Sequence, residues 1–217
     1  MKDTNLNKRS IPSVTISRIC LYHRCLEKII EQEISMLSPY ISSSEIARLT
    51  GINSFQVRKD LAYFGQFGLR GTGYPIRELH QELKKILGLD KFWTVIIAGA
   101  GNLGTALLGY EGFKKRGFLI KGIFDRDPFK IGKKIGNTRV SNISRMREFI
   151  KKENIDIGIL VVTAESAQEV ADKMVEGGIK AIINFTPVRL SLPSAIKINN
   201  VDLSLEFEGL TYYLNLC

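Results

Sequence analysis

The chain has few of the residues that build disulfide frameworks and metal sites. Its 217 residues include three cysteines and two histidines, too few and too scattered for a disulfide framework. Cys20, His23 and Cys25 lie close together and leave a metal site as an alternative, but the remaining histidine, His80, brings no second ligand pair. We therefore predict that the protein holds no metal.

Long apolar runs are absent as well. The longest candidate, residues 93–100, has eight residues, whereas a membrane helix needs about 20. The first ten residues are polar, and no apolar stretch follows them as in a signal peptide. We expect a cytoplasmic protein without membrane contact. The hydrophobic content of 44% and aromatic content of 9% are typical of a globular chain and exclude wholesale disorder.

The positive charge indicates a polyanionic partner without locating it. The formal net charge is +9, and it is spread evenly: residues 1–90 carry 13 basic and 9 acidic side chains, and residues 91–217 carry 18 and 13. Gross charge therefore does not say which part of the chain binds nucleic acid, and local motifs have to decide.

A change of hydrophobic period near residues 88–91 divides the chain. Before it, residues 15–64 favour helices, the glycine-rich run FGQFGLRGTGYP has the length of a hairpin or wing, and an amphipathic helix ends at Gly88. After it, short apolar runs alternate with helical patterns, which indicates a parallel sheet covered on both faces. The predicted strands are residues 93–98, 118–124, 157–162 and 181–185, and the predicted helices between them are 103–116, 145–152 and 167–176.

The segment SSSEIARLTGINSFQVRKDLAYFG has the pattern of a helix-turn-helix. Ala47 is small where two helices cross, Gly51 lies in the turn, and Val57 packs the second helix against the first. The second helix then offers four polar side chains to the major groove or its phosphates: Ser54, Gln56, Arg58 and Lys59.

These side chains suit DNA chemically. Gln and Arg make bidentate contacts with adenine and guanine edges, and Lys suits phosphate. The alternative is a solvated charged face in an interaction-only helical domain. Arg70 and Thr72, on the glycine-rich loop after the helix, favour DNA, because a wing at this place contacts the minor groove or the backbone.

The segment GAGNLG at residues 99–104 has the pattern of a dinucleotide-binding loop, because it follows a predicted strand and opens a predicted helix. Gly99 allows the tight turn, Gly101 lets the backbone approach a pyrophosphate, and Gly104 allows close packing of helix and strand. The helix N-terminus near Asn102 holds the anion. A structural turn without ligand and a site for another nucleotide, such as coenzyme A, are the alternatives.

A carboxylate lies where the adenosine ribose is expected. Asp125 ends the next strand, 21 residues after Gly104, the place of a residue that binds ribose hydroxyls. It would repel a 2′-phosphate, so NAD(H) is favoured over NADP(H), although Arg126 beside it weakens that preference.

No catalytic machinery is evident in the second half. It contains no histidine to serve as the acid or base that a dehydrogenase needs. Tyr110 and Lys114 have the Tyr-x-x-x-Lys spacing of one dehydrogenase class but lie on the wrong element, and Glu165 suits the first turn of a helix. We predict a non-enzymatic protein, with an NAD-dependent dehydrogenase carrying a helical appendage as the alternative.

Residues 15–217 resemble the Rex family of redox-sensing transcriptional repressors. The matching stretches are ISRICLYHRCLE, FQVRKDLAYFGQFGLRGTGY, GAGNLGTALLGY, FDRDP, NFTPVRL and NVDLS. The resemblance implies an α/β chain with a winged helix-turn-helix domain (1–88), a Rossmann-like NAD(H)-binding domain with a parallel sheet (89–200) and a C-terminal helix (201–217) swapped within a homodimer. It also implies binding to palindromic operator DNA when NADH is scarce relative to NAD⁺, and release by NADH.

The motifs and the resemblance together give candidate residues for three roles. The DNA contacts comprise Arg18, Ser54, Gln56, Arg58, Lys59, Tyr63, Arg70 and Thr72. The NADH or NAD⁺ contacts comprise Gly99, Ala100, Gly101, Asn102, Leu103, Gly104, Tyr110, Asp125, Arg126, Thr163, Ala164, Asn184, Phe185 and Thr186. Coupling between the two sites falls to Arg24, Tyr110 and Asp202. From the residues alone the ordinary roles are favoured: Arg24 as a surface charge, Tyr110 as a packing residue and Asp202 as a helix N-cap.

Overall fold

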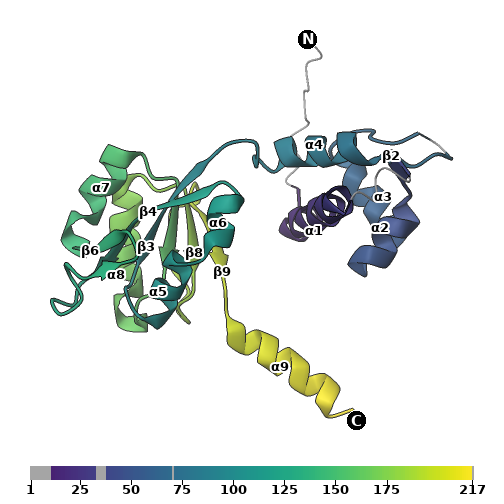
Figure 1. Ribbon diagram of the computed structural model, residues 1–217. Helices are drawn as coiled ribbons and strands as arrows, with labels where there is room; N and C mark the ends of the chain where they lie inside the picture. Colours follow the sequence, from purple (N-terminus) through teal and green to yellow (C-terminus); the bar gives the residue numbers. More distant parts are fainter. Residues whose placement is uncertain (1–10, 33–37, 70, 217) are drawn as a thin grey trace. The chain divides into compact units, whose positions relative to one another are not determined.

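The computed structural model describes residues 11–32, 38–69 and 71–216 (Figure 1). The chain divides into two compact units between Asp90 and Lys91. Among the described residues, no helix is both long and apolar enough to cross a membrane, and no three metal-ligating side chains are grouped.

The N-terminal unit is a small helical domain with a short antiparallel ribbon. A buried cluster, mostly from its helices, forms the core, and Tyr22 is its largest fully buried side chain. The ribbon pairs Ile41 with Tyr74. The elements are α1 (Ser13–Glu31), β1 (Tyr40–Ile41), α2 (Ser43–Thr50), α3 (Ser54–Ala62), β2 (Tyr74–Pro75) and α4 (Ile76–Ile86).

Local chemistry sets the turn between α2 and α3. Ser42 caps α2 in a reciprocal capping box with Glu45. Gly51 ends α2 with φ of +71°, in the left-handed region that glycine adopts without a steric cost. The Asn53 side chain then accepts a hydrogen bond from the Phe55 amide and starts α3. Val57 is fully buried, so the predicted helix-turn-helix is confirmed.

The C-terminal unit is a doubly wound α/β domain. Its seven-stranded sheet has the order β5-β6-β4-β3-β7-β8-β9, and every neighbouring pair is parallel except β5 with β6. Chain order reverses between β3 and β7, as in dinucleotide-binding folds. The elements are β3 (Trp93–Ala98), α5 (Asn102–Leu108), α6 (Glu111–Lys115), β4 (Phe118–Asp125), β5 (Lys134–Ile135), β6 (Thr138–Asn142), the 3₁₀ turn η2 (Ile143–Arg145), α7 (Met146–Glu153), β7 (Ile157–Leu160), α8 (Ala164–Gly177), β8 (Ala181–Asn184), β9 (Lys197–Asn200) and α9 (Leu203–Leu214).

Alternating side chains of β3 show why its run is continuously apolar. Ile96 and Ala98 belong to the core on the side of α7 and α8, and Val95 and Ile97 belong to the core that Leu107 of α5 joins. Successive strand residues point to opposite faces, and helices cover both faces (Figure 1). The predicted parallel sheet is therefore confirmed.

Three expectations about the elements are wrong in detail. The single helix predicted over residues 103–116 is broken at Gly109 and Tyr110 into α5 and α6, where a glycine weakens the helix and the Tyr110 backbone is extended. The β5–β6 hairpin follows no alternating pattern in the sequence and was not expected. β7 ends at Leu160 instead of residue 162, and α8 begins at Ala164 instead of residue 167.

Candidate DNA-binding and dinucleotide-binding sites

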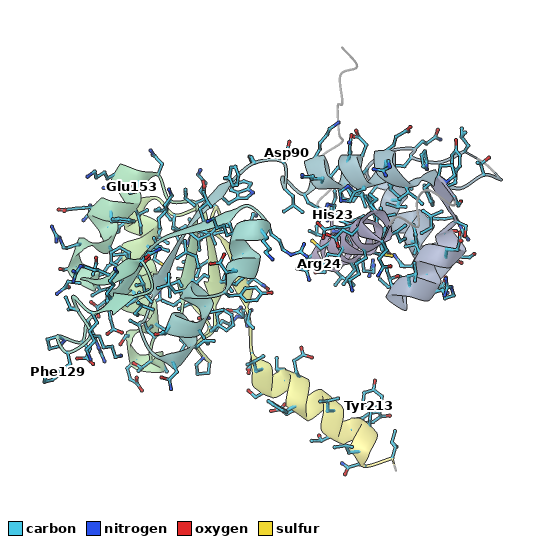
Figure 2. All side chains as sticks on the ribbon, in the orientation of Figure 1. His23, Arg24, Asp90, Phe129, Glu153 and Tyr213 are labelled. Carbon is cyan, nitrogen blue, oxygen red and sulfur yellow. The ribbon has the colours of Figure 1, made fainter. Side chains whose placement is uncertain are left out.

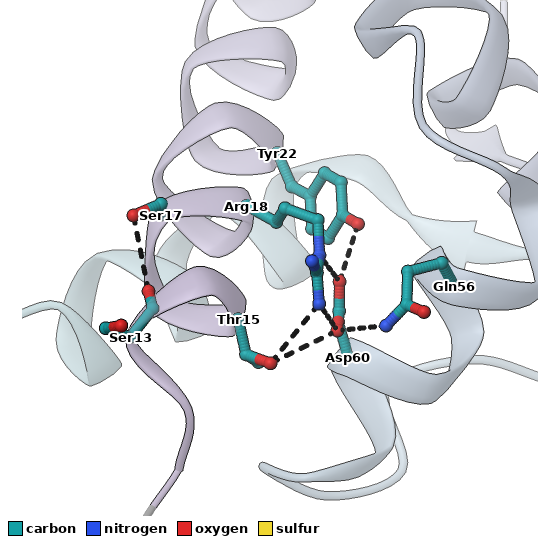
Figure 3. A network of polar contacts seen from close by, with 7 residues as sticks. All are labelled: Ser13, Thr15, Ser17, Arg18, Tyr22, Gln56 and Asp60. Atoms are coloured by element: carbon teal, nitrogen blue, oxygen red, sulfur yellow. Dashed lines mark hydrogen bonds and ion pairs between the residues drawn. The ribbon is translucent and has the colours of Figure 1, made fainter. Parts of the chain in front are cut away.

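A buried carboxylate ties the recognition helix α3 to α1 (Figure 3). Asp60 is fully buried. It accepts hydrogen bonds from Arg18 Nε at 2.6 Å and Nη2 at 2.8 Å, from the Tyr22 hydroxyl at 2.9 Å and from Gln56 Nε2 at 2.7 Å. Such a fully partnered ion pair fixes the orientation of α3 on the domain.

The electrostatics of this network favour its charged form. Burial by itself raises the pKa of Asp60, but the hydrogen bonds from Arg18, Gln56 and Tyr22 outweigh it and hold that pKa below its usual value. Burial, followed by the hydrogen bond to Asp60, raises the pKa of the Tyr22 hydroxyl. Arg18 and Gln56 were expected from the sequence to contact DNA. In the structure both side chains donate hydrogen bonds to Asp60, because a buried carboxylate needs donors.

The solvent face of α3 carries a stripe with helical spacing. Phe55, Arg58 and Lys59 are exposed, and so is Tyr63 just beyond the helix. Arg58 Nη1 donates to Ser43 Oγ on α2 at 2.9 Å. Ser54 lies half-buried at the start of the helix. Sequence reasoning overlooked the apolar Phe55, although its spacing of three and four residues from the two cations places it on their face.

The glycine-rich hairpin makes a groove with α3. Leu69 and Gly73 pair across it in an antiparallel bridge, which agrees with the predicted wing. A cavity of about 660 Å³ lies between wing and helix, lined among others by Arg58, Leu69 and Thr72. Thr72 is exposed as expected, whereas Arg70 lies outside the described residues.

Glycines in the loop after β3 bring three backbones together. Gly99 has φ of +107°, and a Cβ there would collide with the carbonyl oxygen of Val161. A Cβ on Gly104 would collide with the carbonyl oxygen of Gly99. A Cβ on Gly101 meets no atom within 4 Å, so this backbone faces open space. The geometry matches the three roles predicted for these glycines in pyrophosphate binding.

Asp125 is bound into that loop from the end of β4. Its Oδ2 accepts hydrogen bonds from the Ala100 amide at 2.7 Å and from Lys130 Nζ at 3.2 Å, and its Oδ1 accepts from the Asp127 amide at 2.9 Å. Burial raises the pKa of Asp125, but these donors outweigh burial and lower it. The carboxylate therefore stays charged, and Oδ1 retains a lone pair for a ribose hydroxyl. Sequence reasoning overlooked Lys130, whose ammonium group lies beside the same position.

A cavity of about 720 Å³ opens at the carboxyl ends of β3, β4 and β7. Asp125, Arg126 and Lys130 supply charge, and Thr163 contributes at the start of α8. The apolar part of its lining consists of Ile143, Val161, Val162 and Val170. A mostly apolar slot with a few convergent polar groups at the point where strand order reverses is typical of a nucleotide site. Asn102 and Leu103 are exposed in the first turn of α5, and Ala164 is half-buried in that of α8.

Asn184, expected to contact the cofactor, uses its whole side chain within the protein. Its Nδ2 donates to the Val188 carbonyl and to Asn200 Oδ1, both at 2.9 Å, and its Oδ1 accepts from the Thr186 amide and hydroxyl. An amide group has no further hydrogen bonds to give once these four are made. Asn184 therefore shapes the loop after β8, in which Phe185 is half-buried.

Of the three residues assigned to coupling, Arg24 lies in the N-terminal unit, and Tyr110 and Asp202 lie in the C-terminal unit. Arg24 is exposed on α1 (Figure 2). Tyr110 is 60% exposed, caps α6 and packs edge-on against Phe113 at 5.0 Å. Asp202 caps α9 and accepts from the amide and hydroxyl of Ser204. Each side chain has the ordinary structural role that the sequence left open, and all three are on the surface of their own unit.

Family models match both parts of the chain. Residues 10–62 match the model described as "Putative DNA-binding protein N-terminus", and residues 90–188 match the one described as "CoA binding domain". The second match agrees with the Rossmann-like fold.

Full-length relatives have one name in common. Proteins of Pelotomaculum thermopropionicum (50% identical, 94% of each chain) and Carboxydothermus hydrogenoformans (46% identical, 93% of this chain and 95% of the relative) are both named redox-sensing transcriptional repressor Rex. The solved structure of RSP with β-NAD⁺ and operator DNA is 42% identical, with a TM-score of 0.88 over 94% of this chain and 93% of that one. RSP with β-NADH is 41% identical, with a TM-score of 0.85 over 96% of each chain. The chain therefore belongs to the Rex family of redox-sensing transcriptional repressors.

Proposed function

We propose that this protein represses transcription by binding palindromic operator DNA when NADH is scarce relative to NAD⁺, and that NADH releases it. The observation that carries the proposal is a helix-turn-helix with an exposed cationic stripe in the same chain as a complete dinucleotide loop. The solved RSP complexes, with operator DNA and β-NAD⁺ in one and β-NADH in the other, support both ligands. A protein that binds operator DNA in a bacterium would act in the cytoplasm, which is where we propose that it works.

The charged carboxylate of Asp125 favours NAD(H) as the ligand. Asp125 stays ionised beside the loop that Gly99 begins, and a carboxylate favours free ribose hydroxyls over a phosphorylated ribose. Lys130 donates to Asp125 and lines the same cavity. Coenzyme A, which the name of one matching family model suggests, carries a phosphate on that ribose and suits the pocket less well.

DNA contact falls to the exposed face of α3 and to the wing. Arg58 and Lys59 point to solvent from the recognition helix. Tyr63 is exposed just beyond the end of that helix, and Thr72 lines the adjoining groove. Helices of this kind enter the major groove, where Arg reads guanine and Lys meets phosphate. We assign the protein a regulatory role and no catalysed reaction, in line with the names of its relatives, which are transcriptional repressors.

A homodimer explains the C-terminal helix. Every described residue of α9 is exposed, and its side chains, Tyr213 among them, extend into solvent (Figure 2). Large apolar side chains rarely remain uncovered in this number on a soluble unit. A second copy that exchanges α9 would bury them: Leu203, Leu205, Phe207, Leu210, Tyr212, Tyr213 and Leu214 are each 58–73% exposed.

Release by NADH requires linkage between the sites. NADH has to bind the DNA-incompetent arrangement better than the competent one, and a shift from 1:99 to 99:1 needs about a 10⁴-fold preference. We assign Arg24, Tyr110 and Asp202 to this preference. They lie on α1 of the DNA-binding unit, between α5 and α6 of the nucleotide-binding unit, and at the N-terminus of α9.

The test is fluorescence anisotropy on a palindromic duplex at fixed salt, with NADH, NAD⁺, NADPH and coenzyme A titrated separately. Salt is fixed because phosphate contacts make the affinity steeply salt-dependent. We expect NADH to release the duplex at the lowest concentration. Asp125→Ala should bind the duplex but ignore NADH, whereas Asp172→Ala, which removes an exposed carboxylate of α8, should behave like the wild type.

Each failure has a distinct meaning. DNA binding without a response to NADH overturns the ligand assignment, and release by coenzyme A alone would replace it. No binding to any duplex overturns the repressor. An unchanged NADH response in both Arg24→Ala and Asp202→Ala overturns the proposed coupling and leaves the two binding sites standing.

A further inference from the structure

An exposed aromatic ring lies at the leading end of the recognition helix. Phe55 is 65% exposed, although burial of a phenylalanine side chain is worth about 1.5–3 kcal/mol. Its position is well defined, because the Asn53 side chain accepts a hydrogen bond from the Phe55 amide at 2.7 Å and so fixes the first turn of α3. An exposed ring on an ordered helix is available to a partner that offers apolar surface of its own.

The neighbours of Phe55 say what it meets. Val57, Asp60 and Leu61 are buried against the domain, so the opposite face of α3 is the one that approaches a partner. Arg58 and Lys59 follow Phe55 by three and four residues on that face and are exposed. A duplex bound by these two cations therefore meets Phe55, one turn nearer the N-terminal end of the helix, where recognition helices contact base edges.

The chemistry of the ring selects one feature of the groove. A phenylalanine ring carries no hydrogen-bond donor or acceptor in its side chain, so it does not read the polar pattern of base edges. The C5-methyl group of thymine is the apolar feature that a base pair presents in the major groove, and Phe is among the side chains that contact it. We propose that Phe55 is a specificity-determining residue that reads thymine methyl groups in the operator half-site. This inference rests on the proposed DNA binding by α3.

The experiment removes the methyl group without changing the hydrogen-bonding pattern. A palindromic duplex is selected with the wild-type protein from a random library, and each thymine in it is replaced in turn by deoxyuridine. Affinities are measured by fluorescence anisotropy for the wild type and for Phe55→Ala. We expect at least one replacement per half-site to weaken wild-type binding about fourfold, the effect of exposing one buried methyl group.

The affinity of Phe55→Ala should not change when the sensitive thymine is replaced by deoxyuridine. Phe55→Ala should bind the thymine duplex about tenfold more weakly than the wild type, and the sensitive thymine should no longer matter to it. Leu69→Ala is the matched control, because Leu69 is also apolar and 64% exposed but belongs to the wing; it should keep the full uracil effect. Lys59→Ala should flatten the salt dependence of binding, and Phe55→Ala should leave that slope unchanged.

The outcomes separate this inference from the proposed function. Equal uracil effects in the wild type and Phe55→Ala, or no uracil effect at any position, overturn the role of Phe55 while operator binding and NADH release stand. Failure of the wild type to select or bind any duplex overturns both. Because Phe55 is exposed, its removal leaves the core intact, and an unchanged melting temperature together with unchanged NADH binding verifies the fold of the variant.

Discussion

Removal of the buried carboxylate Asp60 should destabilise the N-terminal unit and leave the C-terminal unit intact. Asp60→Ala deprives Arg18, Tyr22 and Gln56 of their common acceptor. Breaking a buried ion pair at one partner costs about 3–5 kcal/mol. The Arg18 side chain is 21% exposed, so water partly solvates the abandoned guanidinium and the lower end, about 3 kcal/mol, applies.

The single tryptophan makes the two units separable in one experiment. Trp93 begins β3 in the C-terminal unit, so its fluorescence follows that unit, whereas hydrogen exchange of α1 and α3 follows the other. A loss of about 3 kcal/mol lowers the melting temperature of a domain of this size by about 15 °C. We expect the tryptophan transition to stay in place while α1 and α3 lose protection from exchange.

Two controls decide whether the ion pair is the cause. Glu82→Ala removes the exposed partner of Lys85 and should have no measurable effect, as for most surface pairs. Arg18→Met combined with Asp60→Leu removes both charges and should recover part of the lost stability, since the Tyr22 hydroxyl still lacks its acceptor. A loss below about 1 kcal/mol in Asp60→Ala would place the pair among ordinary surface pairs and refute the reasoning.

Two further predictions concern the nucleotide loop and a histidine pair. Gly99→Ala should abolish NADH binding and destabilise the C-terminal unit by about 2–3 kcal/mol, because φ of +107° and the Val161 carbonyl oxygen leave no room for a Cβ. Calorimetric titration measures the binding, and Trp93 fluorescence follows the unfolding. Wild-type affinity in the variant would contradict the loop assignment. His80 stacks on His23 with ring centroids 4.5 Å apart, and burial lowers the pKa of His80. The unfolded chain therefore takes up the proton first, so the free energy of unfolding of the N-terminal unit should fall as pH drops through about 6.5. Hydrogen exchange of α1 and α4 measures this loss of stability, and His80→Leu should not show it. A variant with the same pH profile as the wild type would contradict the role of His80.

The sequence predicted the elements whose cause is local. The period of apolar residues placed β3 at the residues the structure has, and glycine chemistry located the turn at Gly51 and the loop at Gly99. Strand–helix alternation was enough for a parallel sheet, because parallel neighbours need crossovers. The assigned DNA and cofactor contacts stay predictions, since no ligand contact has been observed in this chain.

Tertiary structure decided how the polar residues are used. Arg18 and Gln56 read as DNA contacts in the sequence, but the fold brings them to Asp60, a partner 42 residues away from Arg18. No sequence pattern indicates a role for Lys130, but the loop after β4 brings its ammonium group to Asp125.

The sequence by itself determined the two-part architecture and the kind of ligand each part takes, because hydrophobic period, caps and glycine positions act over a few residues. Contacts between distant segments decided which charged side chains face solvent and which are paired in the interior. They also left Phe55 exposed beside Arg58 and Lys59. Burial makes an unpaired charge costly, so the fold assigns partners across the chain that no local pattern reveals.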